Sequence, residues 1–311
     1  MRSRELTKGL AGNGKWKSIK RNAGLYLLLV PAIVVFFWFT YIPMYGVIIA
    51  FKDFRPSLGI MGSKWVGFKY FKQYFNSYMF GNTIKNTIVI SLYTILLTFP
   101  LPIFIALMCN QMAHKFRKFY QVSIYLPHFI SVVVMCGMII LFLSPSSGVI
   151  AKILSFFGVE MPNVMGDPKL FSTIYAVSEA WQHVGWDSIM YVAALSTIAP
   201  ELYEAAEVDG ATRWQKMWKI DFPLLMSTAV ILFILRTGSV MSVGFEKVYL
   251  LQNSLNMPAA ETISTYVYKM GLLSNQYSLS AAIGLFNNVI NFVILMLVNY
   301  IAGKISDNKL F

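Results

Sequence analysis

The stretch ELYEAAEVDGATRWQKMWKIDFPLL, residues 201–225, is a charged segment in an apolar chain. It carries five acidic and three basic residues, and apolar runs without Asp, Glu, Lys or Arg lie on both sides. Four uncharged runs, at 22–51, 86–113, 119–151 and 270–303, exceed the ~20 residues that a helix needs to cross a bilayer. Hydrophobic residues make up 57% of the 311 positions and charged residues 13%. Together these features predict an all-α polytopic membrane protein.

Six membrane-spanning helices are predicted, four from these runs and two from apolar segments with some polar residues. The fifth reaches sufficient length only if the helix continues through Arg236. The sequence FPLP at residues 99–102 predicts a kink in the second span. Two further short helices are expected outside the membrane, over residues 149–157 and 262–271. The six spans are expected over Leu25–Ala50, Thr83–Met108, Ser123–Leu143, Phe171–Ile198, Leu224–Val243 and Ser280–Ala302.

The basic residues lie mainly in segments that six alternating helices place on one side of the membrane. Seven Lys or Arg residues fall within the first 21 positions, and the link at 114–118 and the C-terminal residues add more. Because cytoplasmic loops are enriched in Lys and Arg, both termini are predicted to be cytoplasmic. The formal net charge of +12 therefore reflects topology, and no nucleic-acid partner is expected.

The predicted organisation has no internal repeat and no second soluble domain. The loop after the first span carries five basic residues and one acidic residue over 52–72. This loop is either a solvated segment near the membrane surface or a surface that attracts an acidic solute or partner. The predicted parts are a basic cytoplasmic tail at 1–22, the first transmembrane helix with its outer loop at 23–82, a transmembrane core at 83–305 that contains the inner loop 200–223, and a cytoplasmic tail at 306–311.

The inner loop 200–223 is predicted to form two short helices joined at a glycine. Pro200 is suited to the first turn of a helix, and Gly210 tolerates the left-handed conformation that ends one. Thr212 is suited to cap a second helix, and Pro223 begins the next span. Because both ends continue into membrane helices, the loop is expected to be a rigid, exposed connection between the fourth and fifth spans.

The same loop resembles the EAA signature of type I ABC importer permeases, which reads Glu-Ala-Ala, three residues, Gly, nine residues and Ile-x-Leu-Pro. Phe222 stands where leucine is usual. The resemblance to the carbohydrate-importing, lipoprotein-associated branch of that family spans about residues 25–305. It is carried by the segments PMYGVIIAFKDF, WVGFKYF, SPSSGVI, GDPKLF, WQHVGW and ETISTYVYKMGLL. The matched positions of the signature are Glu204, Ala205, Ala206, Gly210, Ile220 and Pro223.

The resemblance implies a permease in a bacterial inner membrane that pairs with a second, homologous permease. It also implies two ATPase subunits on the inner side, an extracytoplasmic solute-binding lipoprotein and an oligosaccharide as solute. In this family the EAA loop forms the coupling helix, which binds a groove of the ATPase. The residues implied in coupling are Glu204, Ala205, Ala206, Asp209, Gly210, Trp214, Ile220 and Pro223.

Two roles remain open in this loop. Glu204 either pairs with a cation of the ATPase or caps its own helix. Trp214, Met217 and Trp218 are either anchors in a partner groove or packing residues at the membrane ends of neighbouring spans. GLAGNGKW, residues 9–16, approaches a phosphate-binding loop but ends in Trp where Ser or Thr would hold magnesium. No cofactor is therefore expected in this chain, and ATP and Mg are expected to bind the partner ATPase.

Polar residues within the spans are candidates for a solute path because such groups are costly in lipid and face the bundle interior or a wet cavity. Arg236 is expected either to pair with Glu179 or Asp187 or to meet an acidic group of the solute. The alternative for every candidate is hydrogen bonding between helices. The candidates are Glu179, Gln182, His183, Trp186, Asp187, Arg236, Asn287, Asn288 and Asn291.

The sequence allows three alternative functions: an intramembrane enzyme that uses Glu179, His183 and Asp187, a passive channel, and a permease for another solute class. The enzyme is disfavoured because the chain has no H-E-x-x-H or G-x-S-x-G motif, and its three histidines are far apart in sequence. A channel would leave the EAA loop without a role. Among oligosaccharides, the basic outer loop and Arg236 favour acidic, uronate-containing ones.

Overall fold

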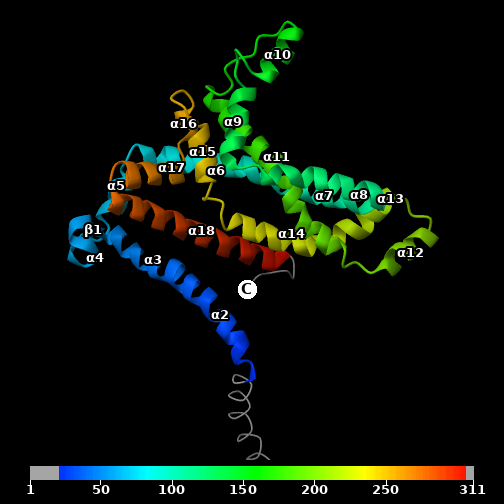
Figure 1. Cartoon of the computed structure of the whole chain (residues 1–311), viewed down its shortest axis with the longest axis horizontal. Coiled ribbons are helices and arrows are strands. Elements are labelled where there is room, and N and C mark those ends of the chain that lie inside the picture. The colour runs from blue at the N-terminus through cyan, green and yellow to red at the C-terminus, as the bar shows by residue number, and fades with distance from the viewer. Residues whose placement is uncertain (1–20, 306–311) are drawn as a thin grey trace, which may run out of the picture. The chain divides into compact units, whose positions relative to one another are not determined.

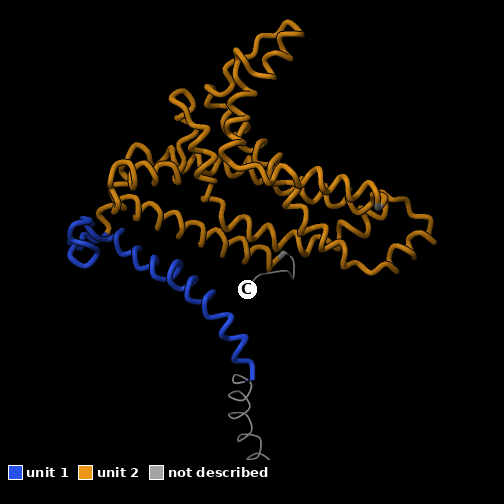
Figure 2. Tube along the Cα trace, viewed as in Figure 1, with its two compact units in different colours: residues 1–67 blue, residues 68–311 orange. Residues whose placement is uncertain are grey.

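The computed structural model describes residues 21–305, and the chain divides into two compact units at Gly67 (Figure 2). Unit 1 contains a long apolar helical segment, in which α2 (Ala23–Phe36) continues through a π-helical turn at Phe37–Tyr41. The segment then passes through α3 (Ile42–Met44) and a 3-10 helix at Tyr45–Phe51. It reaches 29 residues in all, which is long enough to cross a bilayer.

A small antiparallel ladder follows in unit 1, which an all-α prediction did not include. The strands β1 (Lys52–Asp53) and β2 (Lys64–Trp65) pair in the register Lys52 with Trp65. A 3-10 turn at Pro56–Leu58 and α4 (Gly59–Gly62) connect the two strands. The rings of Phe51 and Trp65 stack with centroids 5.7 Å apart.

Unit 2 begins at Phe68, and its regular elements within the described residues are all helices (Figure 1). A 3-10 helix, η4, joins α8 to the break before α9, and a π-helical turn, η5, precedes α14; another π-helical turn occupies Lys269–Leu273. The elements are α5 (Lys69–Phe75), α6 (Met79–Thr98), α7 (Pro100–Gln111), α8 (His114–Tyr125), η4 (Leu126–Phe129), α9 (Val132–Phe142), α10 (Val149–Phe156), α11 (Pro168–Leu195), α12 (Pro200–Val208), α13 (Arg213–Lys216), η5 (Met217–Asp221), α14 (Phe222–Thr237), α15 (Phe245–Leu251), α16 (Met257–Ala260), α17 (Ile263–Tyr268) and α18 (Tyr277–Ile305).

The 28-residue helix α11 is the central element of unit 2, and it packs along α6 and α7. Its buried Tyr175 belongs to an apolar cluster with residues of α6, α9 and α15, and its buried Tyr191 belongs to a second cluster with residues of α7 and α14. A third cluster joins α5, α17 and α18 around Tyr74, Ile263 and Ile283. The core of unit 2 thus draws on most of its helices, and α11 contributes to two of the three clusters.

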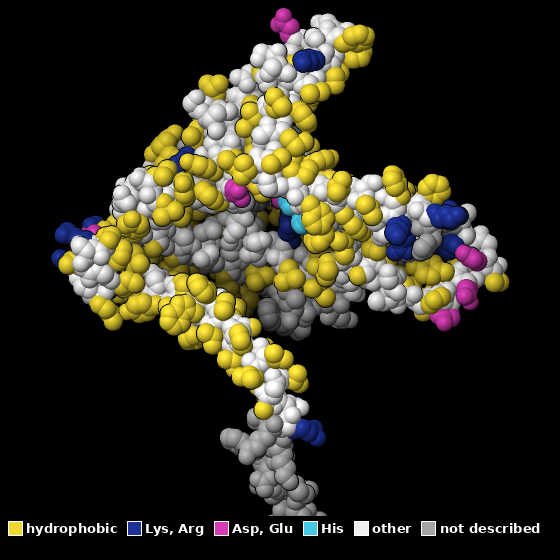
Figure 3. Space-filling model, in the orientation of Figure 1, with side chains coloured by type: hydrophobic (Ala, Val, Ile, Leu, Met, Phe, Trp, Pro, Cys, Tyr) yellow, Lys and Arg dark blue, Asp and Glu magenta, His cyan; other side chains and the backbone are white. Residues whose placement is uncertain are grey.

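Four helical segments among the described residues are long and apolar enough to cross a membrane: Ala23–Phe51, Met79–Gln111, Arg213–Thr237 and Tyr277–Lys304. A bent pair, Lys115–Phe129 with Val132–Phe142, makes up to five if it forms one span. Lys, Arg, Asp and Glu side chains gather at the end of unit 2 that carries α12 and α13 (Figure 3). The multi-pass helical membrane fold is confirmed, whereas the number six and the side of each terminus stay predictions.

Two predicted spans are wrong in detail. The third, expected as one helix over Ser123–Leu143, is bent by 94° at the break before α9, where Pro127 and the cap residue Ser131 interrupt the helix. The basic link before it is helical, because α8 already begins at His114. The fifth, expected to reach Val243, ends at Thr237, and the chain then turns into α15, which the sequence analysis did not predict. The expected interruption near Pro100 is present at Phe99.

Candidate functional site

The 200–223 segment folds as two helical pieces around Gly210, as the sequence predicts. Gly210 has a φ of +74°, which an L side chain rarely adopts. Around it, the Ala211 N–H donates to the Ala206 carbonyl at 2.8 Å and the Gly210 N–H donates to the Glu207 carbonyl at 3.0 Å. These two bonds form a Schellman motif, which satisfies the last carbonyls of α12 and sets the angle at which the chain leaves it.

The second helical piece is held at its start by a capping box. The Thr212 hydroxyl accepts from the Gln215 N–H at 3.3 Å, and Gln215 Oε1 accepts from the Thr212 N–H at 2.8 Å. Across the glycine, Lys216 Nζ lies 2.7 Å from Glu207 Oε1. The hydrogen bond from Lys216 lowers the pKa of the Glu207 carboxyl. The relative direction of the two pieces is therefore fixed by local contacts.

Most of the predicted coupling residues are exposed on this segment. Glu204, Ala205, Asp209, Gly210, Trp214 and Pro223 are exposed, and Ala206 and Ile220 are half-buried. A surface concavity of about 370 Å³ lies beside them, lined by Ala206, Asp209, Gly210, Ala211, Gln215, Lys216, Lys219 and Ile220. Among the described residues, the structure records no hydrogen bond or ion pair for the Glu204 side chain, which therefore does not cap its own helix.

The three large apolar side chains of the second piece have different surroundings. Met217 is 2% exposed and packs in the cluster that contains Leu107 and Leu225, so it belongs to the ends of the spans. Trp214 is 60% exposed, and Trp218 is 41% exposed and lies against Phe222 with ring centroids 5.1 Å apart. Only the two tryptophans therefore remain accessible to a partner groove.

A buried polar network ties the segment to two membrane helices, and the sequence analysis missed it. Asp221 is fully buried at the start of α14. Its carboxylate accepts from the Tyr203 hydroxyl at 2.5 Å and from Gln111 Nε2 at 2.6 Å, and Asn110 Nδ2 donates to the Tyr203 oxygen at 3.2 Å. Burial and the hydrogen bond to Asp221 raise the pKa of Tyr203 to about 12. The network connects α12, α14 and the end of α7.

The interior of unit 2 contains a second group of candidates, the α11 polar cluster, defined as His128, Glu179, Gln182, His183, Trp186 and Lys247. Glu179 Oε2 lies 2.9 Å from Lys247 Nζ, and Glu179 Oε1 lies 3.6 Å from His183 Nε2. Lys247 is 3% exposed and also donates to Gln182 Oε1 at 3.4 Å. The cation that pairs with Glu179 thus comes from α15, whereas the sequence analysis had considered Arg236.

Two histidines that are 55 positions apart in the chain meet in this cluster. His128 Nδ1 and His183 Nδ1 are 3.0 Å apart, and the His128 ring stacks on Trp186 at 4.3 Å between centroids. His128 and His183 therefore meet in space although they are far apart in sequence, so their separation along the chain does not count against an enzyme. Gln182 Nε2 donates to the Ile130 carbonyl at 2.8 Å, in the break between α8 and α9. No group of three or more metal-ligating side chains occurs within residues 21–305.

Arg236 lies in the last turn of α14 and donates to the Thr98 hydroxyl at 3.1 Å. Within the described part of the chain, no carboxylate oxygen lies within 4.0 Å of its guanidinium, so the expected pairing with Glu179 or Asp187 is not formed. Arg236 and Ser239 line two cavities, of about 240 Å³ and about 330 Å³. Glu179 lines the first cavity and Asp187 the second.

The three asparagines of α18 have separate environments. Asn291 Oδ1 accepts from the Met241 N–H at 2.9 Å, and its Nδ2 donates to the Ser242 hydroxyl at 2.9 Å. Asn291 therefore fixes the turn between α14 and α15. The buried Asn287 Oδ1 has no hydrogen-bond partner among the described residues, and Asn288 is exposed. None of the three lines either cavity at Arg236.

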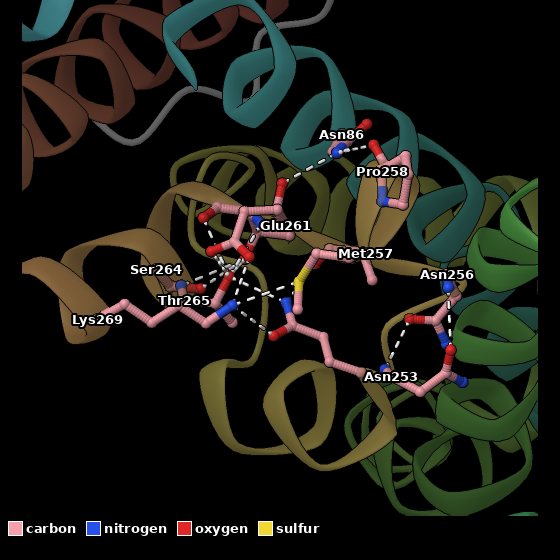
Figure 4. A network of polar contacts seen from close by, with 12 residues as sticks. Asn86, Asn253, Asn256, Met257, Pro258, Glu261, Ser264, Thr265 and Lys269 are labelled. Atoms are coloured by element: carbon pink, nitrogen blue, oxygen red, sulfur yellow. Dashed lines mark hydrogen bonds and ion pairs between the residues drawn. The ribbon is translucent and has the colours of Figure 1, made fainter. Parts of the chain in front are cut away.

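A further polar network fixes the segment that follows α15 (Figure 4). Lys269 Nζ lies 2.5 Å from Oε2 of the buried Glu261 and donates to Gln252 Oε1 at 3.1 Å. Asn86 Nδ2 of α6 donates to the carbonyls of Pro258 and Glu261 at 2.9 and 3.0 Å. The stretch from α15 to α17 is thereby anchored to a membrane helix.

Comparisons with known proteins agree with this architecture. A family model described as binding-protein-dependent transport system inner membrane component matches residues 99–307. Protein LplB of Bacillus subtilis (strain 168) is 40% identical over 304 residues, covering 97% of this chain and 96% of LplB. The polygalacturonan/rhamnogalacturonan transport system permease protein YteP of the same strain is 40% identical over 288 residues, covering 92% of this chain and 90% of YteP.

Two solved structures have the same fold. One is a bacterial ABC transporter involved in the import of the acidic polysaccharide alginate, with a TM-score of 0.84, 41% identity and coverage of 94% of this chain and 99% of that chain. The other is a bacterial alginate ABC transporter in complex with alginate pentasaccharide-bound periplasmic protein, with a TM-score of 0.85, 40% identity and coverage of 95% and 99%.

The fold and these likenesses define a multi-pass permease of the type I ABC importer class, located in the inner membrane. The chain belongs to the family of binding-protein-dependent transport system inner membrane components. This confirms the resemblance inferred from the EAA signature.

Proposed function

We propose that this chain is one of two homologous permease subunits of an ATP-driven importer for acidic oligosaccharides. Two ATPase subunits and an extracytoplasmic binding protein complete the assembly in this proposal. The family membership supports a binding-protein-dependent mechanism, and one structural neighbour is an ABC transporter in complex with a periplasmic protein. The chain crosses the membrane six times, with α11 and the bent pair α8–α9 as two of the six spans and both termini in the cytoplasm.

The observation that carries the proposal is the buried connection of the 200–223 segment to α7 and α14 through Asp221. The exposed helix α12 follows α11 in the chain, and its Tyr203 is hydrogen-bonded to α14 and α7, so α12 moves together with these three helices. A partner that binds the exposed residues differently in its ATP-bound and ATP-free states would therefore shift the permease between its outward-open and inward-open forms. The exposed Glu204, Trp214 and Trp218 and the concavity beside Gly210 form the contact with the ATPase.

In this proposal the chain itself holds no cofactor, and ATP and Mg bind the ATPase subunits. The sequence GLAGNGKW lies outside the described residues. Its rejection as a phosphate-binding loop rests on the sequence, which lacks the Ser or Thr and has no apolar strand before it. The acidic class of the solute is supported by the relatives, one of them named for polygalacturonan and rhamnogalacturonan transport and two solved structures named for alginate. It is also supported by Arg236, which has no carboxylate partner among the described residues.

The test is purification of the tagged chain from its own cells, which is expected to bring down an ATPase and a second permease in stoichiometric amounts. ATP hydrolysis by this complex should then rise with a binding protein loaded with an alginate or galacturonan oligosaccharide, and less with maltopentaose. Absence of any ATPase would refute the assembly, and equal stimulation by the neutral sugar would refute the acidic preference.

Gly210→Pro tests the role of the 200–223 segment within this complex. Proline fixes φ near −65°, whereas Gly210 needs +74°, so the angle after α12 must change. We expect the variant complex to be made but not to import solute. Gly158→Pro is the matched control, because Gly158 has a φ of +73° in the loop after α10. Normal uptake by Gly210→Pro would contradict the assignment.

A further inference from the structure

Two cavities of unit 2 share one charged side chain. Arg236 and Ser239 line both, and the remaining lining residues differ. Side chains of α6, α11 and α14 form most of the walls, and the exposed lining residues Ser239, Met190 and Leu235 show that the cavities open to the surface of this chain. The first is lined also by Ser91, Thr94, Ile95, Tyr175, Glu179, Val240, Ser242, Val243 and Gly244.

Arg236 has more hydrogen-bond donors than partners. A guanidinium carries five N–H donors, and the structure records one hydrogen bond, to the Thr98 hydroxyl at 3.1 Å. Among the residues described, no carboxylate oxygen lies within 4.0 Å of it. Ionisable groups inside membrane helices are costly and usually pair with an opposite charge or mark a solute pathway. Arg236 therefore has the chemistry of a group that is completed by an anion from outside the chain.

The charges around the two cavities are distributed unequally. In the first cavity, Glu179 is offset by Lys247, whose Nζ lies 2.9 Å from its carboxylate, so Arg236 supplies the remaining positive charge. The second cavity is lined by Asp187 of α11 and Arg236 of α14, and no second cation is among its described lining residues. An anionic group is therefore attracted to the first cavity, and Asp187 is suited to accept hydrogen bonds from hydroxyl groups in the second.

We propose that Arg236 binds a carboxylate of an acidic saccharide that occupies the two cavities during passage through the permease, with the carboxylate on the side of the first cavity and hydroxyls of a neighbouring sugar on Asp187. The proposal rests on the proposed function and adds the residue that recognises the acidic group. Arginine suits this role because its planar fork matches both oxygens of a carboxylate, which a lysine cannot reproduce.

The test uses the complete importer in proteoliposomes, with its binding protein loaded with alginate pentasaccharide or a galacturonan pentasaccharide. The variants are Arg236→Gln and Arg236→Lys, and Lys115→Gln is the control because Lys115 is an exposed cation on α8. A hydrogen-bonded charge contact is strong enough for its loss to reduce turnover at least about tenfold. We expect that loss for Arg236→Gln, an intermediate rate for Arg236→Lys and the wild-type rate for Lys115→Gln.

ATP hydrolysis distinguishes solute binding from a structural role. If Arg236 contacts the solute, the loaded binding protein still stimulates ATP hydrolysis in Arg236→Gln while uptake falls. If it only supports the fold, hydrolysis and uptake fall together, and that result overturns the proposal. Uptake at the wild-type rate by both variants overturns the proposal as well. If Arg236→Gln does not assemble, uptake at the wild-type rate by Arg236→Lys overturns it. The proposed function is tested separately by the wild type. Uptake of the acidic pentasaccharides would leave it intact even if the Arg236 proposal fails, whereas uptake of maltopentaose alone would refute the acidic class of the solute.

Discussion

Replacing Tyr203 with Phe tests whether the buried network at Asp221 transmits movement between α12 and the membrane helices. The change removes one hydroxyl and keeps the ring. That hydroxyl donates to Asp221 Oδ1 at 2.5 Å and accepts from Asn110 Nδ2 at 3.2 Å. It is therefore the polar contact through which α12 reaches both α14 and the end of α7.

The expected magnitude follows from the burial of Asp221, which has no exposed surface. A hydrogen bond to a charged group contributes about 1.5–3 kcal/mol, and its loss leaves a buried carboxylate with the 2.6 Å bond from Gln111. If this free energy is lost from the state in which α12 and α14 move together, the equilibrium constant that favours that state falls by about 10- to 150-fold.

The assay compares solute imported with ATP hydrolysed, both measured on the complete importer in proteoliposomes. Tyr203→Phe should assemble with the ATPase and hydrolyse ATP, but it should import less solute per ATP. Tyr300→Phe is the matched control, because it removes a hydroxyl from a side chain that is 63% exposed on α18. An unchanged ratio in Tyr203→Phe would refute the reasoning and leave Asp221 a purely structural residue.

The pH dependence of the same contact has a definite sign. The pKa of Tyr203 is raised from 10.0 to about 12 by burial and by Asp221, so the folded state favours the protonated phenol. The stabilising contribution is complete below pH 10 and is lost as the pH rises toward 12. The unfolding midpoint of the wild type should therefore approach that of Tyr203→Phe across this interval, as measured by thermal unfolding in detergent.

Two other substitutions test the interior of unit 2 by thermal unfolding of the purified protein. A Cβ on Gly185 would lie 1.9 Å from the Ile124 carbonyl oxygen, so Gly185→Ala should destabilise the contact between α8 and α11 by about 1–3 kcal/mol or more. Gly284→Ala is the control, because a Cβ there meets nothing within 4 Å and the protein should not be destabilised. Equal unfolding midpoints for the two variants would contradict the close approach of α8 and α11. Lys247→Met should lower the free energy of unfolding by about 3–5 kcal/mol because it leaves Glu179 without its cation. Adding Glu179→Gln to this variant should restore much of that free energy. If it restores none, Lys247 acts through something other than this pair.

The 200–223 segment was predictable because its geometry depends on local chemistry. Gly210 adopts a positive φ that other residues avoid, and Thr212 caps the helix that follows it. Each of these preferences acts within a few residues, so a single sequence contains the information. The helix ends and the exposed side chains of the segment follow from them.

The interior contacts were not predictable in the same way, because they join residues that are distant in sequence. His128 and His183 meet only because the third predicted span bends at the break before α9, which brings η4 against α11. Lys247 reaches Glu179 only because α14 ends at Thr237 and the chain turns back into α15. The sequence FEKVYLL carries a weak signal for Lys247, which follows Glu246 in an otherwise apolar stretch, because a lysine is almost never fully buried unless it is paired.

The helix α14 connects the Tyr203–Asp221 network with the cavities at Arg236. Asp221 lies at its start and Arg236 in its last turn, about 22 Å apart along a helix at ~1.5 Å per residue. If α14 moves as a rigid body, a shift of the end that carries Asp221 reaches the cavity wall at the end that carries Arg236. Coupling of two binding equilibria is reciprocal. If an ATPase binds the 200–223 segment and the solute binds Arg236, as proposed, the nucleotide state must change solute affinity by the same factor by which solute changes nucleotide affinity. Tyr203→Phe is then expected to reduce both factors together.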